Sequence, residues 1–126
     1  MTADKCQIGR AFYTALVAAD WAALWSLLHD DVRWSLPGDN AISGDAVGVA
    51  AVVARAQQIT SYGVNFELID LRVSAGNVAL LLHYTAQRGG LVLDGHLTTV
   101  CFIRGYRIGR IETYLPDVDA LDAYFV

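Results

Sequence analysis

The chain has 126 residues and a net charge of −4, with 55% hydrophobic and 17% charged residues. This length and composition predict one globular domain over residues 1–126 and exclude a disordered chain. The negative charge gives no electrostatic basis for binding nucleic acid or an anionic membrane, and no stretch has the length of a membrane span. The N-terminus lacks the apolar run of a signal peptide, so we expect a cytoplasmic protein.

The first half of the chain predicts helices that enclose one short strand. Apolar residues at helical spacing predict a helix over residues 2–19, capped by Thr2 or Asp4, and Asp20 caps a second helix that closes at residues 29–31. The alternation of residues 32–36 predicts a strand, and residues 37–40 form a loop. Ser43, Gly44 and Asp45 are expected to open a third helix that runs to about Tyr62, where Gly63 ends it.

The second half predicts strands. Residues 64–73 alternate except at Leu68–Ile69, which indicates a bulge, and residues 75–77 turn into three long antiparallel strands between Val78 and Leu115. Asp117 or Asp119 caps a short terminal helix. Helices followed by strands indicate an α+β fold, in which the helices cover one face of a curved antiparallel sheet.

The first hairpin of these long strands predicts a specific residue pair. If Gly89 and Gly90 form a two-residue turn, residues whose numbers sum to 179 face each other, so His83 lies opposite His96 on one face of the sheet. A shift of one residue would move one imidazole to the other face.

The segment Val78-Ala79-Leu80-Leu81-Leu82 predicts a partner for the sheet. A strand with one solvated face should alternate between apolar and polar residues, and this strand does not. The helices can cover only one face, so we expect a second copy of the chain on the other, in a homodimer packed sheet to sheet.

Short pieces spread along nearly the whole chain resemble the nuclear transport factor 2-like superfamily, specifically its SnoaL-like and ketosteroid-isomerase-like branch. These pieces are Ala18-Ala19-Asp20-Trp21 with Leu24, Asp30-Asp31-Val32, Pro37-Gly38, Gly44-Asp45-Ala46-Val47, Asp94-Gly95, and Arg107-Ile108 through Tyr114-Leu115 with Asp117. The resemblance implies a cone: a strongly curved antiparallel or mixed sheet wraps three N-terminal helices and a short C-terminal helix, leaving a deep apolar pocket.

The catalytic positions of this branch are occupied by other residues here. Where a ketosteroid isomerase has a tyrosine and two acids, our alignment gives Phe12, Leu36 and Thr98. SnoaL-type cyclases have an acid where this chain has Thr113. Limonene-type epoxide hydrolases have tyrosine and asparagine near Trp34 and Leu36, and an aspartate at the position of Thr113.

The histidine pair resembles scytalone dehydratase instead, which uses two pocket histidines on neighbouring strands together with tyrosines. By this resemblance His83 and His96 are the candidate catalytic residues, with Tyr13 as a possible donor. Neutral imidazole can take a proton from an acidic carbon and return one to a leaving hydroxyl near pH 7.

Two functions therefore remain open. One is a cofactor-independent lyase or isomerase that acts on a small apolar carbonyl or cyclic compound through His83 and His96. The other is a non-catalytic small-molecule binding or dimerisation module. The predicted ligand-contacting residues are Tyr13, Phe12, Trp34, Leu36, Thr98 and Thr113. We expect no cofactor and no metal, because Glu112, the nearest further ligand, points to the opposite face from the predicted pocket.

Overall fold

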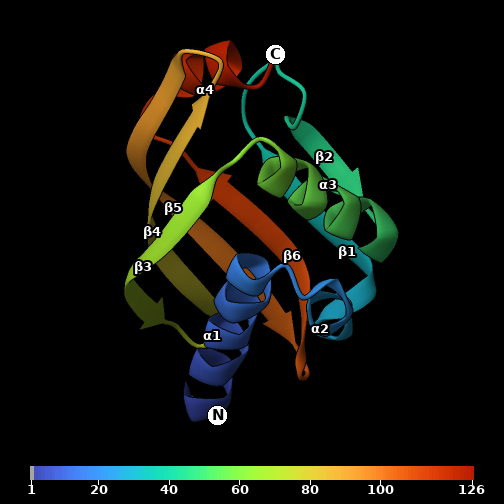
Figure 1. Cartoon of the computed structure of the whole chain (residues 1–126). Helices are drawn as coiled ribbons and strands as arrows, with labels where there is room; N and C mark the ends of the chain where they lie inside the picture. The colour runs from blue at the N-terminus through green and yellow to red at the C-terminus, as the bar shows by residue number, and fades with distance from the viewer. Residues whose placement is uncertain (1) are drawn as a thin grey trace.

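The computed structural model describes residues 2–126, with side chains from Lys5 onward, so the predicted capping by Thr2 or Asp4 lies outside the described residues. Within this range there are four helices and one six-stranded sheet (Figure 1). In chain order they are α1 (Thr2–Ala18), α2 (Trp21–Ser26), β1 (Leu28–Leu36), β2 (Gly44–Val47), α3 (Val49–Ser61), β3 (Asn65–Val73), β4 (Asn77–Arg88), β5 (Leu91–Arg104), β6 (Arg107–Tyr114) and α4 (Val118–Tyr124).

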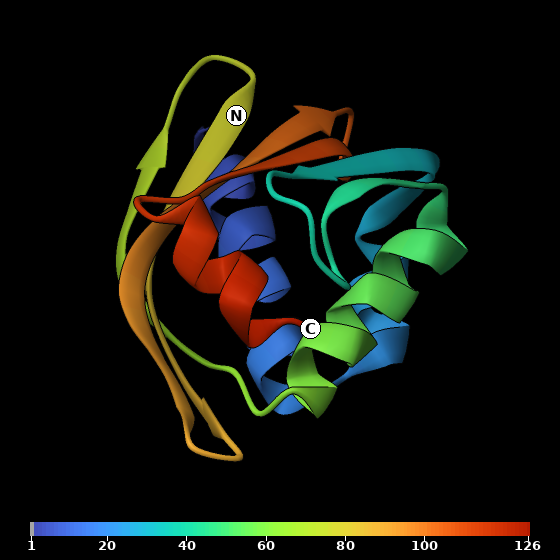
Figure 2. The same cartoon turned by 90° about the horizontal axis from the view of Figure 1, so that it is seen from above.

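The sheet is mixed and strongly curved, as predicted for an α+β cone. Its strand order is β2-β1-β6-β5-β4-β3, and β1 pairs in parallel with β6 while the other neighbours are antiparallel. Seen from above, the sheet bends around the helices, which lie on its concave side (Figure 2). We call the concave side the inner face and the convex side the outer face.

The helices pack against the inner face through apolar side chains. α1 contacts β3 and β4, α3 contacts β1 and β2, and α4 contacts β5. A Cβ atom added at Gly9 of α1 would lie 2.9 Å from Cγ2 of Val78, so this glycine permits close approach of α1 to β4. The residues of the core that are least exposed include Phe12, Leu24, Leu28, Val32, Val52, Val78, Leu80, Cys101, Ile108, Ile111, Tyr124 and Phe125.

The β4–β5 hairpin has the predicted register. Gly89 and Gly90 form the turn, both with positive φ (54° and 87°), and Arg88 pairs with Leu91. Two left-handed residues give the turn the twist that the flanking strands need. His83 consequently pairs with His96, as predicted. The predicted bulge in β3 is also present, because the register shifts between Leu68 and Asp70.

Two boundaries in the first half of the chain differ from the prediction. α2 is capped by Asp20, whose side chain accepts a hydrogen bond from Ala23 N at 3.1 Å, but it ends at Ser26. Residues 29–31 belong to β1 and do not close a helix, because Leu27 O already accepts a hydrogen bond from Ile108 N at 2.8 Å. This bond draws the chain into the sheet.

The predicted start of the third helix was also wrong. Residues 44–47 form strand β2 antiparallel to β1, and α3 begins only at Val49 after Gly48, whose φ is 93°. Asp45 is therefore not a helix cap; its Oδ1 accepts a hydrogen bond from Ser35 Oγ at 2.8 Å. Asp117 caps α4, as one of the two predicted alternatives, by accepting from Ala120 N at 3.1 Å.

No helix within the described residues is long and apolar enough to cross a membrane. Both cysteines are free thiols, as expected, and complete burial raises the pKa of the Cys101 thiol to about 12.

Candidate functional site

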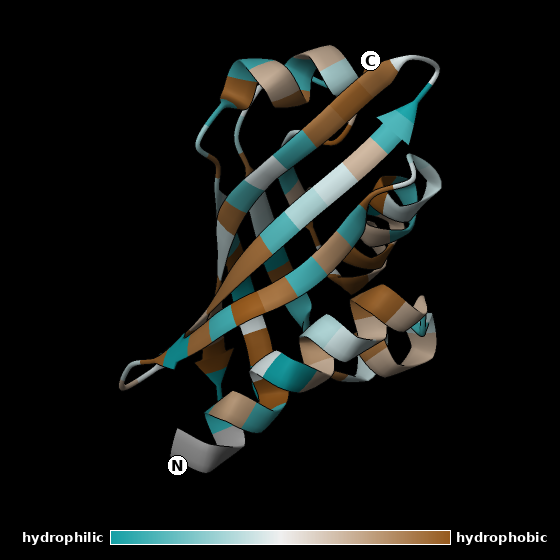
Figure 3. Cartoon of the chain, turned by 60° about the vertical axis from the view of Figure 1, so that its left-hand side comes forward, coloured by the Kyte–Doolittle hydropathy of each residue, from teal (hydrophilic) through white to brown (hydrophobic). Residues whose placement is uncertain are grey.

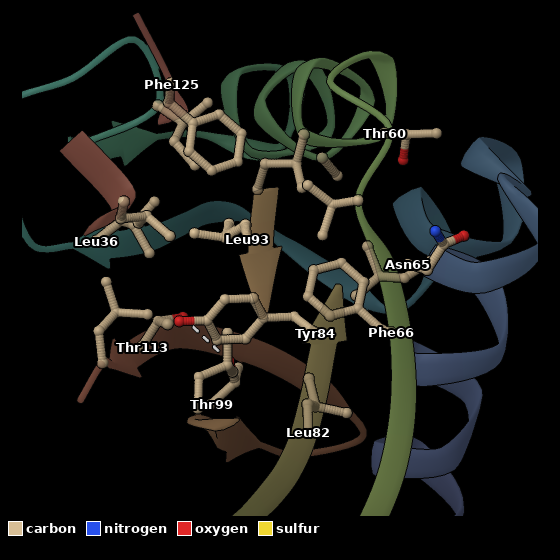
Figure 4. A pocket seen from close by; sticks show the side chains of 18 of the residues that line it. Leu36, Thr60, Asn65, Phe66, Leu82, Tyr84, Leu93, Thr99, Thr113 and Phe125 are labelled. Atoms are coloured by element: carbon tan, nitrogen blue, oxygen red, sulfur yellow. Dashed lines mark hydrogen bonds between the residues drawn. The ribbon is translucent and has the colours of Figure 1, made fainter. Parts of the chain in front are cut away.

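A cavity of about 270 Å³ lies between the inner face of the sheet and the helices (Figure 4). Side chains from α1, β1, α3, the α3–β3 loop, the inner face of β3–β6 and the C-terminal segment form its wall, and most of them are apolar. They are Phe12, Leu16, Val17, Trp34, Leu36, Ile42, Ala56, Ile59, Thr60, Val64, Asn65, Phe66, Leu82, Tyr84, Leu93, Leu97, Thr99, Thr113, Leu115, Leu121 and Phe125, with Gly63. This volume lies just below the range of about 300–1,000 Å³ typical of drug-sized ligands, so a smaller molecule fits.

Three polar side chains on the sheet side of the cavity form a hydrogen-bonded chain. Trp34 Nε1 donates to Thr113 Oγ1 at 3.0 Å, and the Oγ1 atoms of Thr113 and Thr99 lie 3.1 Å apart. Trp34 and Thr113 are each 6% exposed and Thr99 is 4% exposed. They come from β1, β6 and β5, so the chain of bonds ties three strands together at the cavity wall.

Tyr84 is the other buried polar side chain on this wall. It projects from β4 on the inner face, it is 3% exposed, and its partner across the hairpin is Gly95. Burial raises the pKa of Tyr84, and the negative charges of Asp117 and Asp94 raise it further. The phenol is therefore neutral around pH 7 and can donate a hydrogen bond.

Four of the predicted ligand-contacting residues line the cavity. Phe12 of α1, Trp34 and Leu36 of β1, and Thr113 of β6 all contribute to its wall, and all four are buried. Their common position agrees with the prediction of a pocket between the helices and the sheet, and their contact with a ligand stays a prediction.

Tyr13 and Thr98 are not part of that wall. The Tyr13 hydroxyl donates to Phe66 O at 3.2 Å, which ties α1 to β3. Thr98 is on the outer face, because side chains alternate along β5 and its neighbour Thr99 occupies the inner position. The prediction that these two residues line the pocket was wrong.

His83 and His96 face each other but do not face the cavity. Their rings stack with centroids 4.7 Å apart and planes inclined by 20°. Both lie on the outer face with Asp94 and Glu67, because Leu82, Tyr84 and Leu97 occupy the adjacent inner positions. The prediction that this pair projects into the pocket was therefore wrong, because the two side chains lie on the other face of the sheet. The predicted register, which pairs His83 with His96, was correct.

The outer-face surroundings of His83 are acidic. Nε2 lies 2.6 Å from Asp94 Oδ1, and Nδ1 lies 3.7 Å from Glu67 Oε1. The hydrogen bond to Asp94 raises the pKa of His83 above its ordinary value; partial desolvation opposes this shift, and the charges of Asp94 and Glu67 add to it. No cluster of three or more His, Cys, Asp and Glu side chains in the described part of the chain is arranged to hold a metal ion.

Tyr84 and Thr99 are the buried polar wall residues that the sequence analysis missed; it also missed Thr60 and Asn65, which are exposed. A signal for Tyr84 was present, because the same sum of 179 that pairs the histidines places Tyr84 opposite Gly95. A large aromatic ring across from a glycine has space to lie over the neighbouring strand. Thr99 shares the inner parity of Leu93, Leu97 and Cys101, whereas Thr98 shares that of Asp94 and His96.

Solved structures with the same architecture define the class of fold. Bal32a, from a soil-derived mobile gene cassette, has a TM-score of 0.93 at 24% identity, covering 98% of this chain and 97% of that one. An NTF2-like protein from Burkholderia xenovorans LB400 has a TM-score of 0.83 at 20% identity, with coverages of 98% and 96%. TerC, co-crystallised with polyporic acid, has a TM-score of 0.84 at 16% identity, with coverages of 97% and 98%. The fold is thus that of the nuclear transport factor 2-like proteins.

The family follows from the sequence itself. Residues 9–111 match the SnoaL-like domain, which is well over half of the chain. The protein belongs to the SnoaL-like family, and the predicted branch is confirmed. None of the curated proteins matches the chain.

Proposed function

We propose that this protein binds a small, largely apolar molecule in the cavity, and that the cavity acts as a binding site and not as an acid–base catalytic centre. The observation that carries this proposal is the composition of the wall: hydrocarbon side chains with a few neutral polar groups, and no carboxylate or imidazole among the described residues that line it. His83 and His96, the best candidates for proton transfer, lie on the opposite face of the sheet.

The physical chemistry of such a wall favours binding over proton transfer. Apolar surface removed from water contributes about 25 cal/mol per Å², so a hydrocarbon ligand gains affinity from burial alone. General acid–base catalysis needs a group that changes protonation near the working pH, and the raised pKa of Tyr84 moves that side chain away from neutrality. TerC, which shares the fold, is co-crystallised with polyporic acid, which supports a ligand site in this architecture.

Ligand binding in the cavity is tested by filling it from α3. Ala56 faces the cavity, whereas Ala54 of the same helix is exposed. We expect the bicyclic hydrocarbon tetralin to bind the wild-type protein, measured by isothermal titration calorimetry. In Ala56→Leu the added side chain occupies ligand space, so tetralin should bind about tenfold more weakly or worse. Ala54→Leu is the matched control and should bind as wild type.

Equal binding of tetralin by the Ala56→Leu and wild-type proteins would locate the ligand elsewhere and reject the cavity as the site. Circular dichroism and thermal unfolding of both variants establish that a loss of binding is not a loss of fold.

We also propose that the outer face packs against a second copy of the chain. Rows of paired residues cross this face: Leu81, Thr98 and Tyr114 form one row, and Ala79, Val100 and Glu112 form the next. A third row, on the other side of the first, holds His83 and His96. Each row ends at a charged residue of β3: Glu67 beside His83, Asp70 beside Leu81 and Arg72 beside Ala79. A mostly uncharged centre with a charged rim is typical of protein interfaces, and no helix lies on this side of the sheet in the described chain (Figure 2). Tyr114, 55% exposed, belongs to this centre.

A further inference from the structure

The hydrogen-bonded chain on the cavity wall contains more donor hydrogens than it forms hydrogen bonds. The Trp34 indole contributes one N–H, and Thr113 and Thr99 contribute one O–H each. Only two hydrogen bonds join the three side chains, one from Trp34 to Thr113 and one between the threonines. If Thr113 donates to Thr99, the Thr99 hydrogen has no acceptor; if Thr99 donates, the Thr113 hydrogen has none. Either way, one threonine O–H is unpaired within the described part of the chain.

The Tyr84 hydroxyl is a second donor in the same condition. No hydrogen bond joins its hydroxyl to any residue between Lys5 and Val126, and the residue as a whole is 3% exposed. The hydroxyl oxygen is not among the enclosed side-chain atoms that lack a partner in the described residues, so it is accessible from the cavity that Tyr84 lines. Tyr84 lines the same cavity as Thr99 and Thr113, and Figure 4 shows these three side chains projecting from neighbouring strands toward the cavity. Its raised pKa keeps the proton on the oxygen.

Among the described residues, no other side chain of the wall accepts a hydrogen bond from these hydroxyls. The adjacent side chains are hydrocarbons, among them Leu82, Leu93, Leu97 and Leu115, while the Asn65 amide is exposed and approaches Gly63 O at 3.4 Å. A donor that faces the cavity without a partner weakens the binding of any molecule that displaces water from it and does not replace the hydrogen bond.

We propose that the ligand of this cavity carries a hydrogen-bond acceptor oxygen, of the carbonyl or ether kind, on an otherwise hydrocarbon skeleton, and that Tyr84 and the Thr99–Thr113 pair donate to it. This inference rests on the proposed binding function and adds the chemistry of the ligand. Hydroxyl oxygens can also accept hydrogen bonds, but a ligand with donors alone would satisfy lone pairs and leave the O–H hydrogens unpaired. The cavity therefore selects acceptors.

The test compares three bicyclic probes of similar size: tetralin, which has no oxygen, 1-tetralone, which has a carbonyl, and chroman, which has a ring ether. Calorimetry on the wild-type protein should give 1-tetralone and chroman affinities roughly three- to tenfold higher than that of tetralin, the gain typical of a net hydrogen bond.

Variants assign the preference to particular hydroxyls. Tyr84→Phe and the double variant Thr99→Val/Thr113→Val remove O–H groups with little change in shape. The ratio of the affinity for each oxygenated probe to the affinity for tetralin should therefore fall toward one, while tetralin still binds. Thr98→Val and Tyr114→Phe remove a hydroxyl of the same kind from the outer face and should keep the wild-type preference. The double variant also frees the Trp34 N–H, so Tyr84→Phe provides an independent measurement.

Each result discriminates. Equal wild-type affinity for the three probes overturns the acceptor inference and leaves the binding function standing. A preference that survives in both Tyr84→Phe and the threonine double variant overturns the assignment to these hydroxyls. Binding of none of the probes removes the proposed function, and this inference falls with it.

Discussion

His83 has acidic partners on both sides of its ring. Asp94 lies 2.6 Å from Nε2 and Glu67 lies 3.7 Å from Nδ1, and the hydrogen bond to Asp94 is the main reason that the pKa of His83 is raised above its ordinary value of 6.5. Folding therefore favours the protonated imidazole. The resulting stabilisation is fully present below pH 6.5, the unfolded pKa, and is lost as the pH rises through the folded pKa.

Substitution of Asp94 tests this linkage. In Asp94→Asn the pKa of His83 should fall toward 6.5, because the neutral amide no longer favours the imidazolium. The measurement is an NMR titration of the imidazole Cε1–H resonance, assigned by its disappearance in His83→Gln. The thermal unfolding midpoint of the wild type should fall as the pH rises above 6.5. In Asp94→Asn this fall should be smaller.

Glu67→Gln serves as the graded comparison. Because Glu67 lies farther from His83 than Asp94 does, this substitution should lower the pKa of His83 less than Asp94→Asn does. If the His83 pKa in Asp94→Asn matches that of the wild type, the contact with Asp94 does not control the titration.

The two histidines also mark the limit of sequence reasoning at the level of single residues. Their pairing follows from the Gly89–Gly90 turn, and it is correct. The face of the sheet does not follow, because the inner set Val78, Leu80, Leu82 and the outer set Ala79, Leu81 are both apolar. The decisive information was on β5, where Asp94 and Thr98 share the parity of His96. Charged residues belong on the solvated face or at its rim.

At the scale of elements, the packing of the Tyr84 ring of β4 over β5 depends on Gly95. A Cβ atom at this position would lie 2.7 Å from the Tyr84 hydroxyl oxygen and 2.9 Å from Cζ, so the tyrosine ring lies directly over the glycine. An alanine there would force the ring away from β5 and into the cavity.

We predict that Gly95→Ala destabilises the protein by about 1–3 kcal/mol, the usual cost of overpacking, as measured by urea unfolding. Gly76→Ala is the matched control: its Cβ meets no atom within 4 Å, and its φ is not positive. This control should be neutral or slightly stabilising. In the background of Tyr84→Leu, the loss of unfolding free energy caused by Gly95→Ala should largely disappear. An unchanged loss would show that Gly95→Ala does not act by displacing the Tyr84 ring.

Elements were predictable in proportion to the length of their pattern. The long strands β4, β5 and β6 are separated by glycine turns and span eight or more residues each, so the strands and the turns between them were predicted. β2 spans four residues that include Gly44 and Asp45, and this is too short for alternation to separate a strand from the first turn of a helix. The predicted strand at residues 32–36 was shorter than β1, because a hydrogen bond from Ile108, which is distant in sequence, decides where β1 begins.

At the scale of the whole molecule, the curvature of the sheet gives its two faces different surroundings. The inner face is covered by α1, α3 and α4 and encloses the cavity, whereas the outer face has no covering element within residues 2–126 (Figures 1 and 2). Hydrophobic and hydrophilic residues both occur along the long strands, which agrees with an outer face of mixed character (Figure 3). The family fold was predictable from short motifs, but the shape of the cavity was not, because it is the space left between elements that pack from all parts of the chain.

The last prediction concerns the oligomeric state. Thr98 lies in the middle row of the outer face, between Leu81 and Tyr114, and its side chain points away from the cavity. If two outer faces pack together, Thr98→Arg places a buried charge near the centre of the interface in both copies. An unpaired buried charge strongly opposes association, so this variant should be monomeric.

Light scattering coupled to size-exclusion chromatography should give twice the chain mass for the wild type across the micromolar range and one chain mass for Thr98→Arg. The wild-type melting temperature should rise with protein concentration, and that of Thr98→Arg should not. Ala54→Arg places the same charge at an exposed position of α3, away from the outer face, and should remain dimeric. Because Thr98 does not touch the cavity, tetralin binding by the Thr98→Arg monomer separates the two roles of the sheet: retained binding means that each copy holds its own complete site. A wild type that is monomeric throughout, or a Thr98→Arg variant that still dimerises, would mean that the outer face does not mediate self-association.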